Sequence, residues 1–331
     1  MKILLYLEAE EFLAHSGIGR AMKHQQQALD LMGIEWTTDP SDDYDILHAN
    51  TYGVKTMRVI KEAKKAGKKV IFHGHSTRAD FRNSFIGSNF SSGFFCWWIM
   101  RYYKKADLML TPTDYSAELI KSYGITAPII PISNGINLAK YAKNEAKEAA
   151  FRDYFHIKSG EKVVVNAALY FKRKGIDDFI EVAKALPDVR FIWFGFQALW
   201  TIPAKIRRLV ENPPKNVLFP GYIKGDVFEG ALTAADAFFF PSREETEGIV
   251  VLEALASHQK VLVRDIPVYN GWLDANSVSF GSDVASFLSA LTDILDAKVD
   301  KTAAGYAVAE SRAIDVIAGQ LAQAYEKVLT A

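Results

Sequence analysis

Short apolar segments alternate with stretches of helical periodicity along almost the whole chain. Each apolar segment has the length of one strand, and most are followed by a helical pattern before the next one begins. Strands that alternate with helices in this way form parallel sheets covered by helices. The sequence therefore predicts an α/β fold with strands at 3–7, 45–48, 70–73, 108–111, 129–132, 162–166, 190–194, 217–219, 237–240 and 261–263.

The predicted strands fall into two sets, separated by a polar helical stretch at 144–157. A chain of 331 residues is long enough for two domains of ordinary size. We expect a first domain at 1–148 and a second at 149–331, with ligands bound in a cleft at the carboxyl ends of the strands. A final helix at about 314–329 has apolar residues at helical spacing and must pack against one of the two.

The composition narrows the classes of function. The formal net charge is zero, which gives no indication of nucleic-acid binding, and the single cysteine, Cys96, excludes an internal disulfide framework. The first residues turn acidic too early for a signal peptide, and no apolar run reaches the ~18 residues of a transmembrane helix. We expect a cytoplasmic protein, with a peripheral place on a membrane left open.

Two glutamates, Glu245 and Glu253, lie eight positions apart in a run that follows the strand at 237–240 and leads into a helix. Gly248 stands between them, so the free backbone N–H groups of the helix start lie between the two carboxylates. A helix N-terminus binds anions, whereas flanking carboxylates grip hydroxyl groups and repel phosphate. This arrangement suits a ligand that is part phosphate and part polyol, as a nucleotide sugar is. The alternative is an acidic helix cap, because acids favour helix starts in any case.

Three cations, Lys172, Arg173 and Lys174, follow the first strand of the second set and open a helix. Fixed cations at such a point suit the departure of a nucleoside diphosphate, because negative charge develops on the leaving group. The alternative is a solvated basic turn.

The run from Pro241 to Ala254 resembles the E-x7-E motif of the family 4 glycosyltransferases, which are retaining enzymes with the GT-B fold of two Rossmann-like domains. The resemblance implies that the C-terminal helix crosses back onto the first domain. It also implies a UDP-hexose donor, no cofactor and no bound metal. Retention of the anomeric configuration follows from the resemblance as well. Because no carboxylate nucleophile is evident in the first half, we favour displacement on a single face of the sugar.

The resemblance assigns roles to the acidic run and to one loop. Glu245 corresponds to the residue that holds hydroxyls of the donor sugar, and Glu253 to the one that holds the ribose. Glu247 stands where the family often has Phe. The other donor-binding candidates are backbone groups beside the phosphates and a loop that reads the base, namely Gly248, Ile249, Val250, Gly221 and Tyr222.

The basic turn matches the family pattern in part. Lys174 stands just before a glycine, as the family's catalytic lysine does. The family usually has an arginine five residues before this lysine, and that position is Leu169 here. We expect Arg173, or failing that Lys172, to supply the missing charge.

In the first half, Gly17 and Gly19 follow the first strand and precede a helix. Met22 breaks the dinucleotide pattern G-x-G-x-x-G, which argues against a bound nicotinamide cofactor. The resemblance implies that this loop approaches the donor diphosphate, or the acceptor, with bare backbone. The alternative is a tight strand–helix turn that needs glycine.

Two histidines, His73 and His75, stand at the end of the strand at 70–73. The resemblance implies that one of them touches the donor sugar, and we favour His75. A metal site is disfavoured because no further His/Cys cluster follows at ligand spacing, and a structural histidine is the alternative for either. Asn134 precedes Gly135 as at the family's exit from the first domain, although the pair also suits an ordinary turn.

Residues 55–105 contain twelve basic residues against only two acidic ones. Their basic helix is followed by an aromatic run, a combination typical of a surface that docks on an anionic membrane. The alternative is a buried helix with a basic end, because Trp and Phe most often belong to cores. The candidates for contact with the acceptor or the membrane are Lys61, Lys64, Lys65, Lys68, Trp97 and Trp98.

Segments at 172–179, 191–194, 212–216 and 264–267 are similar to the short glycolipid glycosyltransferases of Gram-positive bacteria. Those enzymes add a second sugar to monoglucosyl-diacylglycerol and so make the diglycosyl lipid that anchors lipoteichoic acid. We therefore expect a membrane glycolipid acceptor, glucose or galactose as the donor hexose, and a place on the inner face of the cell membrane. The alternatives are a transferase of the same fold for cell-wall or capsular polysaccharide, and a non-catalytic sugar-binding protein.

Overall fold

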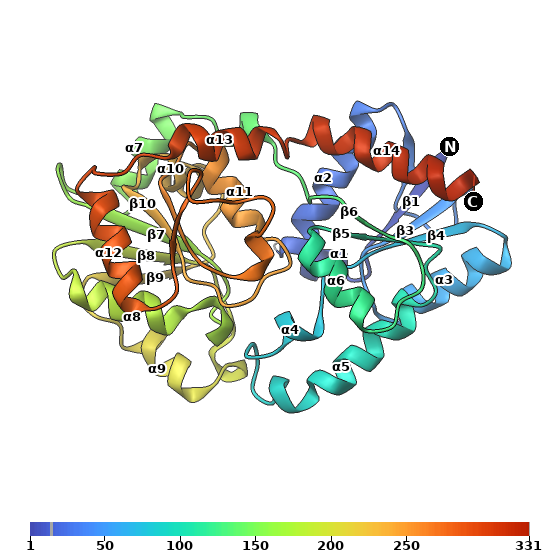
Figure 1. Ribbon diagram of the computed structural model, residues 1–331, viewed down its shortest axis with the longest axis horizontal. Coiled ribbons are helices and arrows are strands. Elements are labelled where there is room, and N and C mark those ends of the chain that lie inside the picture. Colours follow the sequence, from blue (N-terminus) through green and yellow to red (C-terminus); the bar gives the residue numbers. More distant parts are fainter. Residues whose placement is uncertain (14–15, 331) are drawn as a thin grey trace. The chain divides into compact units, whose positions relative to one another are not determined.

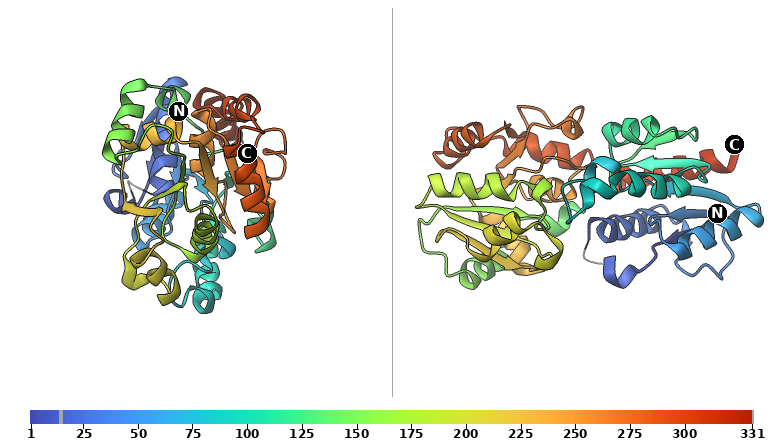
Figure 2. Two further views of the ribbon diagram at one scale, coloured as in Figure 1. Left: turned by 90° about the vertical axis from the view of Figure 1, so that its left-hand side faces the viewer. Right: turned by 90° about the horizontal axis from the view of Figure 1, so that it is seen from below.

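The computed structural model describes residues 1–13 and 16–330, which divide into two compact units (Figure 1). Of the described residues, unit 1 takes those within 1–81, 90–136 and 312–331, and unit 2 takes 82–89 and 137–311. Each unit holds one six-stranded sheet in which every pairing is parallel. Helices flank the sheets, as the further views show (Figure 2). The predicted α/β class is confirmed.

The sheet of unit 1 has the strand order β2-β1-β3-β4-β5-β6. Its strands are β1 (Lys2–Tyr6), β2 (Glu35–Thr37), β3 (Ile46–Ala49), β4 (Lys69–His73), β5 (Leu108–Thr111) and β6 (Ile129–Pro131). Its helices are α1 (Glu10–Leu13), α2 (Gly17–Leu31), α3 (Val54–Lys65), α4 (Arg78–Phe81), α5 (Ser88–Tyr103), α6 (Asp114–Ser122) and α14 (Ile314–Thr330). The strand order reverses its direction between β1 and β3.

The two faces of this sheet bury separate cores, because successive side chains of a strand point to opposite faces. Ile3 and Leu5 of β1 pack with residues of α2 and α14, whereas Leu4 packs with residues of α3 and α5. Leu321 and Tyr325 of α14 are buried in the same core as β1. The C-terminal helix is therefore part of unit 1.

The sheet of unit 2 has the order β12-β11-β10-β7-β8-β9. Its strands are β7 (Val163–Ala167), β8 (Arg190–Phe194), β9 (Val217–Gly221), β10 (Ala237–Phe240), β11 (Val261–Arg264) and β12 (Ser279–Gly281). Its α-helices are α7 (Glu145–Tyr154), α8 (Ile176–Ala185), α9 (Ala204–Glu211), α10 (Asp226–Ala234), α11 (Ile249–Ala256), α12 (Val284–Leu295) and α13 (Thr302–Glu310). Short 3-10 helices are η1 (Leu138–Tyr141), η2 (Lys172–Lys174), η3 (Leu199–Thr201) and η4 (Pro267–Tyr269).

The division between the units differs from the one expected at 148/149. The helix α7 packs against α10, where Lys147 pairs with Glu229 at 2.5 Å. A Cβ atom added to Gly230 would lie 1.9 Å from the backbone oxygen of Lys147, so glycine permits this close approach. The structure therefore places 137–148 in unit 2. Residues 14, 15 and 331, which the expected domains include, lie outside the described residues.

Candidate active site

The main candidate site lies at the carboxyl ends of β7 and β10 in unit 2. The chain runs from β7 outward through β8 to β9 and then returns to place β10 on the other side of β7. Ligands of open parallel sheets bind at such a switch point. The basic turn η2 follows β7 and the acidic run follows β10, so the topology brings the two sequence motifs to one place.

Lys174 and Glu245 meet at this switch point as an ion pair. The Nζ of Lys174 donates to Oε1 of Glu245, which also accepts a hydrogen bond from Oγ of Ser242 at 2.6 Å. Both charged side chains are largely buried, with exposed fractions of 12% and 9%. Removing either partner would leave a buried charge without its counter-charge. The two residues therefore hold each other in position.

Arg173 is fixed beside the same carboxylate. Its Nη1 lies 3.9 Å from Oε1 of Glu245 and donates to the backbone oxygen of Glu244 at 3.0 Å. Its Nε donates to Oγ of Ser84 at 2.9 Å, and its backbone N–H donates to the oxygen of Asn83. The segment 82–89 belongs to unit 2, although it precedes β7 by more than seventy residues.

The electrostatics keep Glu245 ionised. Burial by itself raises the pKa of a carboxyl group, because it disfavours the charged form. The charges of Lys174 and Arg173 and the hydrogen bonds from Lys174 and Ser242 outweigh burial, so the pKa of Glu245 lies below its ordinary value of 4.5. Glu245 is therefore a carboxylate at neutral pH and can only accept hydrogen bonds.

The start of α11 gathers the other donor-binding candidates of the acidic run. Gly248 precedes the helix with φ +92°, a conformation that favours glycine. As the N-cap, Gly248 has no side chain that could accept a hydrogen bond from the first turn. The backbone N–H groups of that turn, which includes Ile249 and Val250, are therefore available to another acceptor. Glu247 and Glu253 are both fully buried at this helix. The residues predicted to contact the phosphates and the ribose thus lie at, or within the first two turns of, one helix.

The predicted base-reading loop lies at the end of β9, on the edge of the same sheet. Gly221 has φ +84°, and its backbone oxygen accepts from the N–H of Gly195 at 2.9 Å. Tyr222 is half exposed. Since β9 and β7 are both neighbours of β8, this loop and the basic turn η2 lie at the same carboxyl edge.

In unit 1, the two candidate histidines belong to a buried polar cluster. The rings of His73 and His75 stack with centroids 4.1 Å apart. Gln25 of α2 donates to Nδ1 of His73 at 3.1 Å, and Nε2 of His75 donates to Oδ1 of Asn50 at 2.8 Å. Burial lowers the pKa of His73 to about 3 and that of His75 well below its ordinary value, with the other imidazoles of the cluster adding to the effect on His75. Both histidines are therefore neutral.

The glycine loop of unit 1 forms the first turn of α2. Ser16 caps this helix by accepting from the N–H of Gly19 at 3.2 Å. Gly17 is exposed, and a Cβ atom added there would meet nothing within 4 Å. Packing within the structure therefore does not require a glycine at this position. The backbone oxygen of Asn134 accepts a hydrogen bond from Nδ1 of His24 at 3.1 Å.

The candidates for membrane contact, which lie on or just after α3 and on α5, differ in their interactions with the rest of unit 1. Lys64 pairs with Asp107 at 2.9 Å and Lys68 pairs with Asp43 at 3.0 Å. Trp98 donates its indole N–H to the backbone oxygen of Tyr52 at 2.8 Å. The remaining three candidates, Lys61, Lys65 and Trp97, are exposed.

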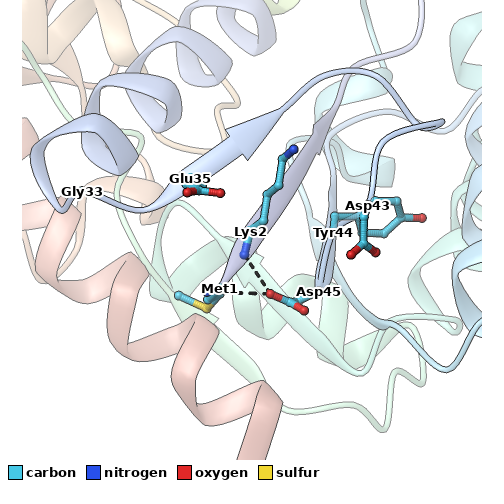
Figure 3. Close-up of a pocket in the computed structure, with 7 residues that line it drawn as sticks. All are labelled: Met1, Lys2, Gly33, Glu35, Asp43, Tyr44 and Asp45. Atoms are coloured by element: carbon cyan, nitrogen blue, oxygen red, sulfur yellow. Dashed lines mark hydrogen bonds and ion pairs between the residues drawn. The ribbon is translucent and has the colours of Figure 1, made fainter.

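Metal-binding groups, membrane-spanning helices and surface pockets were the other features that could indicate a site. No group of three or more His, Cys, Asp or Glu in the described ranges could hold a metal ion. Within the same ranges, no helix is long and apolar enough to cross a membrane. A polar surface pocket of unit 1 lies at the amino ends of β1 and β2, the edge opposite the strand ends that carry the candidate residues (Figure 3).

Sequence reasoning missed two residues that hold the site together. Ser242 lies within the acidic run, three residues before Glu245, so its position was a usable signal. Ser84 gave no signal, because it lies far from either motif along the chain and reaches Arg173 only through the packing of unit 2.

Comparison with known proteins identifies two matching families. "Glycosyltransferase Family 4" matches residues 27–140, and "Glycosyl transferases group 1" matches residues 147–307. The chain is 44% identical over 332 residues to the processive diacylglycerol alpha-glucosyltransferase of Acholeplasma laidlawii, with 99% of each protein covered. It is 27% identical over 237 residues to the alpha-galactosylglucosyldiacylglycerol synthase of Streptococcus pneumoniae, with 70% of this chain and 63% of that protein covered.

Solved structures share the architecture at low sequence identity. Anabaena HepE in complex with UDP-glucose superimposes with a TM-score of 0.74 and 18% identity, over 99% of this chain and all of that one. Sucrose-phosphate synthase from Thermosynechococcus elongatus superimposes with a TM-score of 0.81 and 16% identity, over 100% of this chain and 99% of that one. Identities this low carry the fold and nothing further.

Proposed function

The chain belongs to glycosyltransferase family 4 and has the GT-B fold, and from that membership we propose that it transfers glucose from UDP-glucose to monoglucosyl-diacylglycerol with retention of configuration. The observation that carries the proposal is the buried Lys174–Glu245 pair at the switch point of unit 2, beside the start of α11. Cations, a carboxylate and free helix N–H groups are what a nucleotide sugar requires there.

In the proposed reaction, the bond between C1 of glucose and the UDP oxygen breaks, and C1 bonds to a hydroxyl oxygen of the acceptor. The hydroxyl proton passes to the departing UDP. Negative charge grows on the leaving diphosphate, and Lys174 and Arg173 are the groups that stabilise it. Because these fixed cations supply the charge, we propose that the reaction needs no metal ion.

We propose roles for the other residues from the family resemblance, and their positions are compatible with those roles. Glu245 holds Lys174 and offers its carboxylate to glucose hydroxyls, while Glu253 holds the ribose. The first N–H groups of α11 bind the diphosphate, and the loop at Gly221 and Tyr222 binds the base. In unit 1, His75 is the candidate for a contact with the donor sugar, as a neutral imidazole.

The choice of hexose and acceptor rests on the relatives. The full-length relative from Acholeplasma laidlawii is named as a diacylglycerol alpha-glucosyltransferase. UDP-glucose carries glucose in the α configuration, so an α-linked product means retention. A processive enzyme would also accept its own product, which makes monoglucosyl-diacylglycerol and diacylglycerol the two acceptors to compare.

We propose further that unit 1 docks on an anionic membrane surface through one face of α5. Phe90, Phe94 and Trp97 lie on one stripe of this helix, at spacings of four and three residues, with exposed fractions of 97%, 66% and 52%. Arg101 continues the stripe and lies over the ring of Trp97 at 5.0 Å, and Lys104 follows it. An aromatic stripe that ends in cations suits the interface of a membrane with anionic headgroups.

The experiment that tests the function is a transfer assay with the purified protein on mixed vesicles. The donors are UDP-glucose and UDP-galactose, and the vesicles contain monoglucosyl-diacylglycerol, diacylglycerol or neither. We expect diglucosyl-diacylglycerol from UDP-glucose, an α linkage by NMR, and the same rate in the presence of EDTA.

The Lys174→Met variant is the inactive comparison, because it removes the charge and keeps most of the side-chain volume. Its rate is expected to fall by about 10²-fold or more. If the protein glucosylates a water-soluble oligosaccharide and neither lipid, the lipid acceptor is wrong. If it binds UDP-glucose and transfers nothing to any acceptor, a sugar-binding role takes its place.

A further inference from the structure

Tyr269, a residue outside both sequence motifs, points its hydroxyl at the start of α11. It is the last residue of η4, in the loop that follows β11, the strand next to β10. Its side chain is 1% exposed. The hydroxyl oxygen lies 3.6 Å from the position that a Cβ atom on Gly248 would take. Since Gly248 has no side chain, the hydroxyl faces the helix start directly.

This hydroxyl has no hydrogen-bond partner within the described part of the chain. Buried hydroxyl groups are nearly always hydrogen-bonded, and leaving one without a partner reduces stability. The two other atoms nearest to the position of a Gly248 Cβ are apolar and belong to Val251 and the ring of Phe240, and Trp272 packs edge-on against Tyr269. A buried donor that has no acceptor within the fold is available to donate a hydrogen bond to a bound ligand.

We propose that Tyr269 positions the hexose of the donor by donating a hydrogen bond to the sugar hydroxyl that Glu245 binds. This inference rests on the proposed function and adds a residue to it. Burial raises the pKa of Tyr269 well above its ordinary value, and the charge of Glu245 raises it further. The tyrosine therefore keeps its proton and acts as a donor, while the ionised Glu245 can only accept.

The pairing of a donor with an acceptor selects a hydroxyl group over a phosphate oxygen. A sugar hydroxyl donates one hydrogen bond and accepts others, so it satisfies Glu245 and Tyr269 together. A phosphate oxygen would accept from Tyr269 but would be repelled by the carboxylate of Glu245. The hexose, not the diphosphate, is therefore the part of the donor that Tyr269 recognises.

The test compares Tyr269→Phe with wild type by calorimetry, using UDP, UDP-glucose and the four UDP-glucoses that lack the 2-, 3-, 4- or 6-hydroxyl. Removing one hydrogen bond to the hexose is expected to weaken UDP-glucose about five- to tenfold, and UDP not at all. For the one deoxy donor that lacks the recognised hydroxyl, variant and wild type should bind equally. Tyr306→Phe, in α13, is the matched control and should change nothing.

A second measurement separates this role from simple packing. The unliganded Tyr269→Phe protein should unfold at the same temperature as wild type or higher, because the change removes a buried hydroxyl that has no partner. Unchanged binding of UDP-glucose, an equal loss for UDP and UDP-glucose, or a constant ratio across all four deoxy donors would each overturn the role of Tyr269.

The same titrations separate this inference from the proposed function. If wild type binds UDP-glucose and Tyr269→Phe binds it equally well, only the role of Tyr269 is wrong. If wild type binds UDP and gains nothing from the attached glucose, the proposed donor falls together with the role of Tyr269.

Discussion

Lys174 and Glu245 form a buried ion pair, which we propose is arranged for a ligand. Burial disfavours both charges, but at Glu245 the ion pair and the hydrogen bonds outweigh that cost. Ser242 supplies the extra hydrogen bond that a buried carboxylate needs, and Arg173 adds a second cation 3.9 Å away. A surface ion pair would do little for stability or for a ligand, whereas we propose that this buried group is preorganised for the charge that develops during transfer.

We expect a double-mutant cycle to separate the structural part of this pair from its catalytic part. Lys174→Met alone and Glu245→Gln alone should each lower the free energy of unfolding by about 3 kcal/mol, because each strands a buried charge. The double variant should be more stable than either single variant, yet it should transfer no sugar. Urea unfolding and the transfer assay provide the two readouts. Simple additivity of the two losses would show that the charges do not interact.

The pH dependence of stability provides a second test at the residue scale. The pKa of Glu245 is lower in the folded protein than its ordinary value of 4.5. A depressed carboxyl pKa contributes stability that is present above the unfolded-state value and is lost as the pH falls through the folded-state value. Wild type should therefore lose more stability between neutral pH and pH values below 4.5 than Glu245→Gln does. Parallel curves in urea unfolding at several pH values would contradict this.

At the scale of elements, the junction between η2 and α8 positions Lys174. Gly175 has φ +78°, and a Cβ atom there would lie 2.2 Å from the backbone oxygen of Pro241 in the next loop. The basic turn and the acidic run are thus in backbone contact at this glycine. The sequence showed a lysine followed by a glycine, and the reason for the glycine appears only in the contact.

We expect Gly175→Ala to push these two loops apart. Both the strained φ and the clash act, so stability should fall by about 2 kcal/mol or more, and turnover should fall with it. Gly160→Ala is the matched control, because Gly160 has φ +77° and meets no atom within 4 Å. The control should lose about 1 kcal/mol from strain alone and keep its activity. Equal effects of the two substitutions on turnover would refute the role of the contact.

The helix α5 carries the prediction about the membrane. Replacing Phe90, Phe94 and Trp97 by Ser should abolish co-sedimentation with anionic vesicles, because it removes the apolar part of the surface. Lys61→Ser with Lys65→Ser should weaken binding in a salt-dependent way, by about 1 kcal/mol for each lysine close to the lipid. UDP binding should be unchanged in both variants. Full binding by the aromatic variant would rule out α5 as the docking face.

At the scale of the whole molecule, the chain's last helix completes the unit in which the chain begins. Residues of α14 share a core with β1 and α2, so unit 1 consists of segments from both ends of the sequence. The segment 82–89 lies in the sequence between two stretches of unit 1 but belongs to unit 2. Neither unit is a continuous stretch of chain, so a cut at one linker position would not separate them.

We expect Leu321→Ala to destabilise unit 1 by about 3 kcal/mol, because the side chain is 2% exposed in the shared core. Val316→Ala, on the exposed side of the same helix, should stay within about 0.5 kcal/mol of wild type. Calorimetry of UDP binding should show that unit 2 still binds its ligand in both variants. A loss of UDP affinity in Leu321→Ala that matches the loss of stability would mean that the units do not fold separately.

The sequence alone determined the classes of element and the two motifs, because periodicity and local residue types report directly on strands, helix starts and charged turns. Strand ends were placed within one or two residues, except that the short edge strands β2 and β12, with few residues to show a pattern, were not predicted. Tertiary structure decided what the motifs touch. Strand order brings Lys174 to Glu245, and folding across long stretches of chain adds Ser84 and Tyr269. Those contacts depend on loop paths in space, which no local pattern records.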